Sequence, residues 1–198
     1  MRPKIAIEEI YNAALNVFAE FGYKKATVED IAGKLDMTKG NLYFYAKNKK
    51  DLYEKTVAYA LVNWQTLVRD AVLKETSAKN QLLTMCQKAI DYLDEAHELR
   101  GILKRDPEIF PMFPISDPYE KINNDSIQMI RVILNKGIKE KDFRPVNIDR
   151  ISTVIFSIYK MFIIRTYIQD NADRDHIREL FDETMDLATK GLFVKDGF

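Results

Sequence analysis

Hydrophobic residues recur at steps of three and four along most of this chain, which is the spacing of one face of an α-helix. The first stripe of this kind consists of Ile7, Ile10, Ala14, Phe18 and Phe21. Pro3 suits the first turn of a helix, and Gly22 suits its end. The pattern therefore predicts a helix over residues 3–21.

Two short helices joined by a tight turn are expected next. Thr27 can accept a hydrogen bond from a free backbone N–H at the start of one helix. Thr38 can do the same for a second helix over residues 39–45. Asp36 and Met37 lie between them as the break. A helix, a short turn and a helix in this order form a helix-turn-helix arrangement.

Longer helices follow in the remainder of the chain. The periodicity predicts them over residues 49–74, 77–99, 118–136, 149–169 and 173–193. Four of the six prolines lie in residues 101–118, so we expect an irregular crossover there, with one short helical turn near Gly101. The fold class is therefore all-α, with about nine helices. We divide it into a head of residues 1–48 and a body of residues 49–198.

The clearest chemical signal lies in residues 38–50, which read TKGNLYFYAKNKK. This segment contains four lysines, three aromatic residues and no acidic residue. The start of a recognition helix faces base edges, a glycine permits close approach, and Thr, Asn and Lys side chains can bind bases or phosphates. A lysine-rich loop by itself is more often a solvated surface. The cap at Thr38 and the glycine at position 40 favour a DNA-binding tip instead.

Residues 8–55 resemble the N-terminal domain of the TetR family of bacterial transcription regulators. The matching residues are Ala13, Ala14, Phe18, Glu20, Gly22, Tyr23, Thr27, Val28, Ile31, Ala32, Thr38, Gly40, Leu42, Tyr43, Lys49 and Leu52. The resemblance implies a homodimer, in which two recognition helices enter major grooves roughly 34–36 Å apart on a palindromic operator. It also implies pairing of the last two helices, helices 8 and 9, across the dimer. The family's DNA contacts fall on Thr27, Thr38, Lys39, Gly40, Asn41, Tyr43, Tyr45 and Lys49.

Two residues depart from the family pattern. Asp36 stands where the family usually has a turn glycine, and Asp tolerates a left-handed backbone better than most residues. Ala46 stands where the family usually has a phenylalanine that anchors the recognition helix. We expect Leu42 and one aromatic residue to be buried, with Phe44 as the candidate to replace that anchor. Tyr43 and Tyr45 are expected nearer the surface.

The body is expected to bind a small-molecule effector. The candidates for its pocket are Trp64, Met85, Tyr92, Phe110, Met112, Phe113, Arg131, Tyr159, Met161 and Arg165. The apolar and aromatic members could equally belong to the core. Arg131 and Arg165 lie on apolar stripes, where a cation is costly unless it is paired. They could bind an anionic or polar ligand, but we favour ion pairs or packing at the dimer interface.

Other chemistries find little support. Cys86 is the only cysteine, so we expect no intrachain disulfide, and it is far in the sequence from His97 and His176, so we expect no metal site. Glycine-rich phosphate loops and nucleophile-elbow motifs are missing, so we expect neither an enzyme nor a cofactor. The apolar runs are shorter than a membrane span, which predicts a cytoplasmic protein.

The charges of the whole chain cancel, with 30 Lys and Arg against 30 Asp and Glu. That balance does not exclude DNA binding, because the four lysines of residues 38–50 are a local basic tip. We expect a ligand-responsive regulator, a repressor that a small-molecule effector releases from its operator. Two alternatives stay open: a helical protein–protein adaptor, and a small-molecule binding protein without operator binding.

Overall fold

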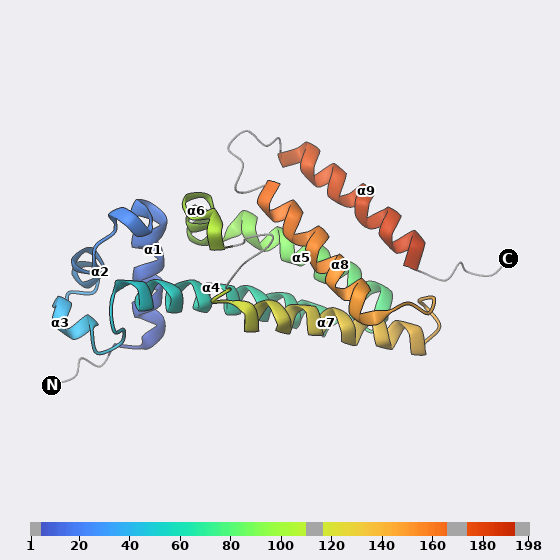
Figure 1. Cartoon of the computed structure of the whole chain (residues 1–198), viewed down its shortest axis with the longest axis horizontal. Helices are drawn as coiled ribbons and strands as arrows, with labels where there is room; N and C mark the ends of the chain where they lie inside the picture. Colours follow the sequence, from blue (N-terminus) through green and yellow to red (C-terminus); the bar gives the residue numbers. More distant parts are fainter. Residues whose placement is uncertain (1–4, 110–116, 166–173, 193–198) are drawn as a thin grey trace.

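The structure, a computed structural model, describes residues 5–109, 117–165 and 174–192. Within these ranges it is built from helices and contains no strand, which confirms the all-α class (Figure 1). The helices are α1 (Ile7–Lys25), α2 (Val28–Lys34), α3 (Lys39–Leu42), α4 (Lys49–Val72), α5 (Ala78–Glu95), α6 (His97–Arg105), η1 (Pro107–Ile109), α7 (Glu120–Lys139), α8 (Ile148–Ile163) and α9 (Arg174–Leu192).

Helices α1, α2 and α3 form a head at one end of the molecule (Figure 1). Its core is the buried face of α1 against Ile31 of α2 and Leu42 of α3. The side chain of Thr27 accepts from the backbone N–H of Asp30, and that of Thr38 accepts from Asn41, so both predicted caps are confirmed.

Two positions in the head have a left-handed backbone. Asp36 has a φ of 50°, as expected for the residue in the tight turn between α2 and α3. Gly22 has a φ of 75° and a non-helical backbone, so the regular helix is interrupted where the sequence predicts its end, and a further helical turn after this kink continues α1 to Lys25. Glycine suits this position because the left-handed region is strained for most L side chains.

Helix α4 belongs physically to both parts of the molecule. Its first turns pack on α1, where the Tyr53 ring lies 4.9 Å from the rings of both Phe18 and Tyr23. It then continues into the body, where it packs against α5 and α7 (Figure 1). The division of the chain after residue 48 stays a prediction, and α4 spans the two parts.

The prediction of an irregular segment over residues 101–118 is wrong for its first five residues, because they belong to the helix α6 (His97–Arg105). Leu99, Ile102 and Leu103 are its buried face, and it packs closely against α1. A Cβ atom on Gly101 would lie only 3.2 Å from Cβ of Ala19, so the glycine permits this close approach. The fifth helix ends at Glu95 instead of residue 99 because the backbone bends at Ala96.

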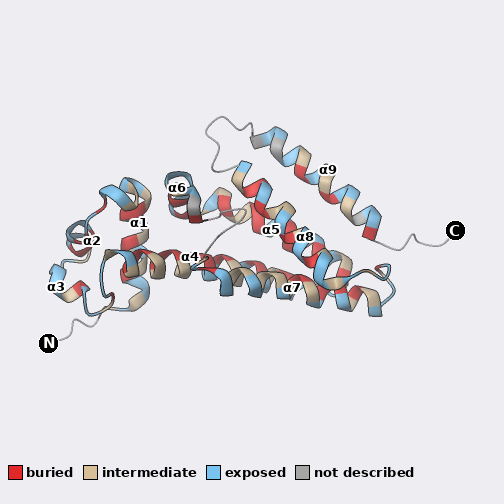
Figure 2. Cartoon of the chain, in the orientation of Figure 1, coloured by how far each residue is buried: buried red, intermediate tan, exposed pale blue. Residues whose placement is uncertain are grey.

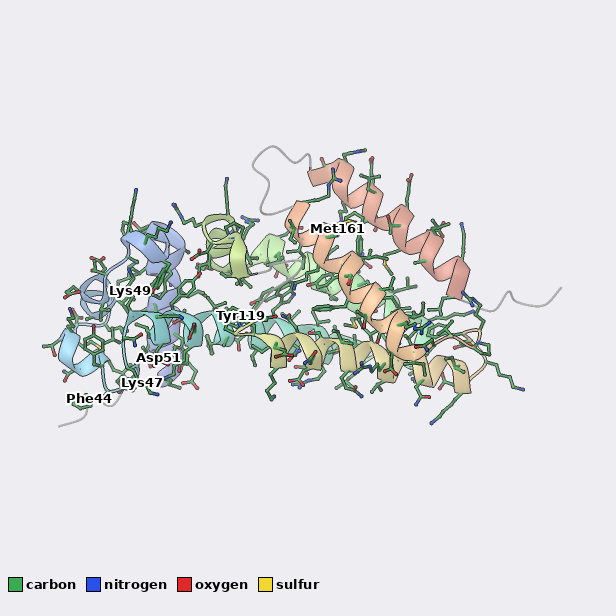
Figure 3. All side chains as sticks on the ribbon, viewed as in Figure 1. Phe44, Lys47, Lys49, Asp51, Tyr119 and Met161 are labelled. Atoms are coloured by element: carbon green, nitrogen blue, oxygen red, sulfur yellow. The ribbon has the colours of Figure 1, made fainter. Side chains whose placement is uncertain are left out.

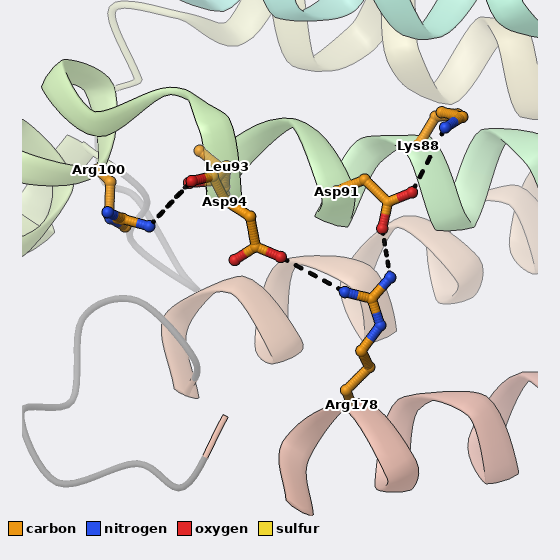
Figure 4. A network of polar contacts seen from close by, with 6 residues as sticks. All are labelled: Lys88, Asp91, Leu93, Asp94, Arg100 and Arg178. Atoms are coloured by element: carbon orange, nitrogen blue, oxygen red, sulfur yellow. Dashed lines mark hydrogen bonds and ion pairs between the residues drawn. The ribbon is translucent and has the colours of Figure 1, made fainter. Parts of the chain in front are cut away.

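Helices α8 and α9 lie on the side of the body away from α4, with α9 outermost (Figure 1). The rings of Phe162 and Phe181 meet edge to face at 5.1 Å, and Arg178 of α9 forms ion pairs with Asp91 and Asp94 of α5 (Figure 4). Helix α8 ends at Ile163, earlier than predicted, and residues 166–173 lie outside the described residues.

Candidate nucleic-acid interface and ligand pocket

The outer end of the head presents most of the predicted DNA contacts together. Thr27, Thr38, Lys39 and Gly40 are exposed, Asn41, Tyr45 and Lys49 are half-buried, and Tyr43 is 40% exposed. Helix α3 itself ends at Leu42, three residues earlier than predicted. The chain continues to Tyr45 as tight turns, in which the N–H groups of Phe44 and Tyr45 each bond to a carbonyl three residues back.

Lys39 is held by an acidic neighbour in the free protein. Its Nζ lies 2.7 Å from Oε1 of Glu29 on α2 and 5.9 Å from the centroid of the Tyr43 ring. The hydrogen bond between the two charged groups raises the pKa of Lys39 and lowers the pKa of Glu29. Lys39 is therefore charged at neutral pH, and it must leave Glu29 to reach DNA.

Lys49 lies in the first turn of α4, at the joint between the head helices. Its Nζ donates to the backbone oxygen of Lys24 at 3.3 Å and lies 4.8 Å from the Tyr23 ring centroid. The carbonyl end of α1 and an aromatic face both attract a cation. These contacts offset the unfavourable position of a lysine at a helix start and fix its ammonium group.

The side chain of Asp51 links the end of α3 to the start of α4 (Figure 3). Its Oδ2 accepts from the backbone N–H of Lys47 at 2.8 Å and from Nζ of Lys55 at 2.9 Å. Lys55 also donates to the backbone oxygen of Tyr45 at 3.2 Å. The hydrogen bond from Lys55, followed by that from Lys47, lowers the pKa of Asp51.

A narrow, partly open pocket lies in the body between α4, α5, α7 and α8, with a cavity volume of about 60 Å³. It is lined by Leu61, Trp64, Gln65, Val68, Met85, Cys86, Ala89, Ile122, Asn123, Ser126, Met129, Ile130, Ile155, Phe156 and Tyr159. The lining is mainly apolar, as in most small-molecule sites. Trp64, Met85 and Tyr159 thus lie where the sequence suggested a pocket, and Tyr92 stacks on Trp64 with ring centroids 5.8 Å apart.

The remaining candidates lie elsewhere. Arg131 pairs with Asp149, with Nε 3.0 Å from Oδ1, which is the ion pair that we favoured. Arg165 is exposed, and Met161 is 39% exposed (Figure 3). In the described part of the chain, none of these three lines the pocket. Phe110, Met112 and Phe113 lie outside the described residues.

The comparisons with known proteins point to one family. Residues 10–56 match the model of the bacterial regulatory proteins of the tetR family. The transcriptional repressor KstR2 of Mycolicibacterium smegmatis is 26% identical over 145 residues, which are 73% of this chain and 70% of that protein. The fatty acid metabolism regulator of Bacillus subtilis is 29% identical over 98 residues, half of each chain.

The fold agrees over almost the whole chain. The crystal structure of FadR from Bacillus subtilis, in complex with stearoyl-CoA, superimposes with a TM-score of 0.76 at 19% identity. The match covers 94% of this chain and 99% of FadR. The head of this chain therefore carries the helix-turn-helix domain of the TetR family. This helix-turn-helix domain comprises α1–α3 and the start of α4, and the helices that follow form the body with the pocket.

One expectation about this TetR-family head is wrong. Phe44 does not replace the missing phenylalanine at position 46, because its side chain is 62% exposed at the outer end of the head (Figure 3). Ala46 is buried, and Leu42 is buried without a fully buried aromatic neighbour from residues 43–45. The polar contacts of Asp51 and Lys55 instead hold the segment after α3, at Lys47 and Tyr45.

A buried cation in the body was missed by sequence reasoning. Lys160 on α8 is only 7% exposed, and its Nζ lies 5.9 Å from the ring of Phe156, a pocket residue. Burial lowers the pKa of Lys160, while the charge of Asp117 acts against this shift. The signal was present in the sequence, because Lys160 lies four residues after Phe156 on one helix face.

The sequence analysis also considered a metal site, the cysteine and a membrane span, and the structure describes part of the chain for each. No group of three or more His, Cys, Asp or Glu side chains there could hold a metal ion. Burial raises the pKa of Cys86 to about 12, so its thiol stays protonated at neutral pH. None of the described helices combines the length and the apolar character needed to cross a bilayer.

Proposed function

We propose that this protein is a dimeric repressor that binds a palindromic operator and is released by a small-molecule effector. The observation that carries the proposal is the combination of an exposed, capped α3 at the tip of the head with an apolar pocket in the body. The named relatives, a repressor and a fatty acid regulator, support the same combination. As a regulator of operator DNA it acts in the cytoplasm and catalyses no reaction.

The DNA contacts of this proposal are Thr27, Thr38, Lys39, Gly40, Asn41, Tyr43, Tyr45 and Lys49. Thr38, Lys39, Gly40 and Asn41 lie at the start of α3, which suits contacts to base edges. Lys49 suits a phosphate, because its ammonium group is fixed beside Tyr23. The hydroxyl of Thr27 is already bonded to Asp30 at 2.6 Å, so we assign Thr27 to positioning α2 as well as to DNA.

The pocket is the proposed effector site, and α4 is the proposed lever. Leu61, Trp64 and Val68 of α4 line the pocket, while Tyr53 of the same helix packs in the head. A ligand that binds one tilt of α4 better than the other shifts the spacing of the two heads. FadR of Bacillus subtilis was crystallised with stearoyl-CoA, which supports an effector with a long apolar part.

The testing experiment is a gel shift of DNA from upstream of the protein's own gene at moderate salt. We expect a shift. Lys49→Ala should weaken binding to all DNA sequences alike and reduce the slope of log affinity against log salt concentration by about one. Asn41→Ala should instead change which sequences are bound. Lack of any DNA shift would favour the adaptor or the pure ligand-binding protein.

A further inference from the structure

The polar groups of the pocket gather where α4 meets the first turns of α7. Gln65 Nε2 donates to the backbone oxygen of Ile122 and to Oγ of Ser126, both at 2.9 Å. A backbone carbonyl can only accept, so this end of the Gln65 amide is its NH₂ group. Both of its hydrogens are therefore used within the protein.

Two neighbouring donors are also used within the protein, one N–H group of the Asn123 amide and the hydroxyl of Ser126. Asn123 Nδ2 donates to Oδ2 of Asp117 at 2.7 Å, and the hydroxyl of Ser126 donates to the oxygen of Ile122 at 3.3 Å. Within the described part of the chain, no group donates to the amide oxygen of Gln65 or of Asn123. This end of the pocket therefore offers a ligand mainly hydrogen-bond acceptors.

The lining also lacks a charge for an ionic ligand. Its described residues are apolar, aromatic or neutral polar, and the thiol of Cys86 stays protonated. Two charged side chains lie next to lining residues and have opposite signs. Lys160 follows Tyr159 in the chain, and Asp117 accepts a hydrogen bond from Asn123. The charge of Asp117 also stabilises the charged form of Lys160. A carboxylate in this pocket would lose its hydration without gaining a cation in the lining.

We infer that the effector is an uncharged, largely apolar molecule that carries a hydrogen-bond donor, such as a hydroxyl group, at one end. The inference rests on the proposed function, in which this pocket is the effector site. The apolar part lies among Leu61, Val68 and Ile130, and the hydroxyl donates its one hydrogen to the amide oxygen of Gln65, beside that of Asn123.

Trp64 provides a direct reading of pocket occupancy. It is the only tryptophan of the chain and lines the pocket, stacked on Tyr92. The full-length protein is titrated with decan-1-ol, decyl methyl ether and decanoate at neutral pH, and Trp64 fluorescence gives each dissociation constant. We expect the alcohol to bind about threefold to tenfold more tightly than the ether, which cannot donate. Decanoate should bind at least about tenfold more weakly than the alcohol.

A variant pair tests the residues. Gln65→Met should abolish the preference for the alcohol over the ether. Gln81→Met is the matched control, because Gln81 also donates to a backbone oxygen at 2.9 Å but lies outside the pocket lining. Circular dichroism melts establish that both variants fold. The three titrations of the unaltered protein test the inference even if a variant does not fold.

The outcomes separate the two proposals. Equal binding of alcohol and ether, or tighter binding of decanoate, would overturn the inference and leave the pocket as the effector site. If none of the three ligands changes Trp64 fluorescence, the pocket is not a site for apolar effectors, and the proposed function loses its effector site. Tightest binding of the alcohol, lost in Gln65→Met alone, supports both.

Discussion

At the scale of single residues, the DNA-facing lysines differ in what holds them. Lys49 is held by a backbone carbonyl and an aromatic ring, neither of which carries a negative charge. Lys39 is held by Glu29, a carboxylate that would itself face the phosphates. The acidic partner therefore both positions Lys39 and opposes DNA binding, and the balance of these effects can be measured.

We predict that Glu29→Gln strengthens operator binding about twofold to fivefold, because an exposed ion pair contributes little and its removal frees Lys39. The change is measured by fluorescence anisotropy over a range of salt concentrations. Glu20→Gln is the control, since Glu20 pairs with Lys34 at 3.7 Å and not with a proposed DNA contact. Weaker binding by Glu29→Gln would mean that Glu29 chiefly positions Lys39.

A pH prediction follows from Asp51, whose pKa is lowered first by its hydrogen bond with Lys55. A carboxyl with a lower pKa in the folded state adds stability above its unfolded pKa of about 4, and that stability is lost as the pH falls through the folded value. Thermal melts between pH 7 and pH 3 should therefore show the head losing stability below about pH 4.

Asp51→Asn should lower the melting temperature at pH 7 and reduce the loss on acidification. Asp125→Asn is the matched control, because Asp125 also pairs with a lysine four residues away on a helix, at 3.2 Å, but caps nothing in the head. An unchanged pH profile for Asp51→Asn would assign the acid sensitivity to other carboxyl groups.

At the scale of helices, sequence reasoning succeeded where the cause is local. The predicted caps at Thr27 and Thr38 are both present, because each needs only one side chain and a backbone N–H three residues on. It failed where packing decides. Helix α6 forms in a segment with a central glycine because its apolar face meets α1, and the position of Phe44 depends on how three helices meet.

The site was predictable to a similar degree. The exposed tip follows from the pattern of residues 38–50, since its residues are neighbours in the sequence. The pocket combines side chains from four helices, so only Trp64, Met85 and Tyr159 were anticipated as lining. The polar end formed by Gln65 and Asn123 depends on the contact of α4 with α7, which no local pattern specifies.

A hydrogen bond between α4 and the residue that follows α6 gives a prediction at the scale of helices. Tyr53 is 8% exposed, and its hydroxyl donates to Oδ2 of Asp106 at 2.7 Å, just after α6. Burial, followed by this hydrogen bond, raises the pKa of Tyr53, so the group stays protonated. Tyr53→Phe should lower the free energy of unfolding by about 1–2 kcal/mol, measured by urea denaturation.

The same variant should weaken the effect of an effector on DNA affinity, because it loosens the link between α4 and the end of α6. Tyr59→Phe is the control on the same helix, where the hydroxyl makes no hydrogen bond in the described part of the chain. If the two variants are equally stable, the bond between Tyr53 and Asp106 contributes little to the fold.

At the scale of the whole molecule, the neutral net charge conceals an uneven distribution of charged side chains. The basic residues 38–50 lie at the tip of the head, while acidic side chains such as Asp91 and Asp94 are paired within the body (Figure 4). Affinity for DNA therefore rests on local contacts and on the pairing of two heads, and non-specific binding should be modest. We therefore expect tight operator binding to depend on the proposed dimer.

The proposed dimer surface lies on α8 and α9, where apolar side chains remain exposed in the single chain (Figure 2). Val154 is 49% exposed and Leu187 is 75% exposed, and both border a groove between the two helices. A second copy brings the same surface, so a two-fold axis would let each Leu187 enter the apolar surface of its mate. Four paired helices would then bury this face.

We predict that Leu187→Asp raises the dimer dissociation constant at least about tenfold, because a carboxylate would be buried in an apolar contact. Light scattering over a concentration series measures the dimer, and operator binding should weaken in parallel. Leu73→Asp is the matched control, since Leu73 is 70% exposed but lies after α4, outside the groove of α8 and α9. Equal melting temperatures would show that both variants keep the fold. If Leu187→Asp dimerises as well as Leu73→Asp, the two protomers meet through another face, and the heads would have a different spacing on DNA.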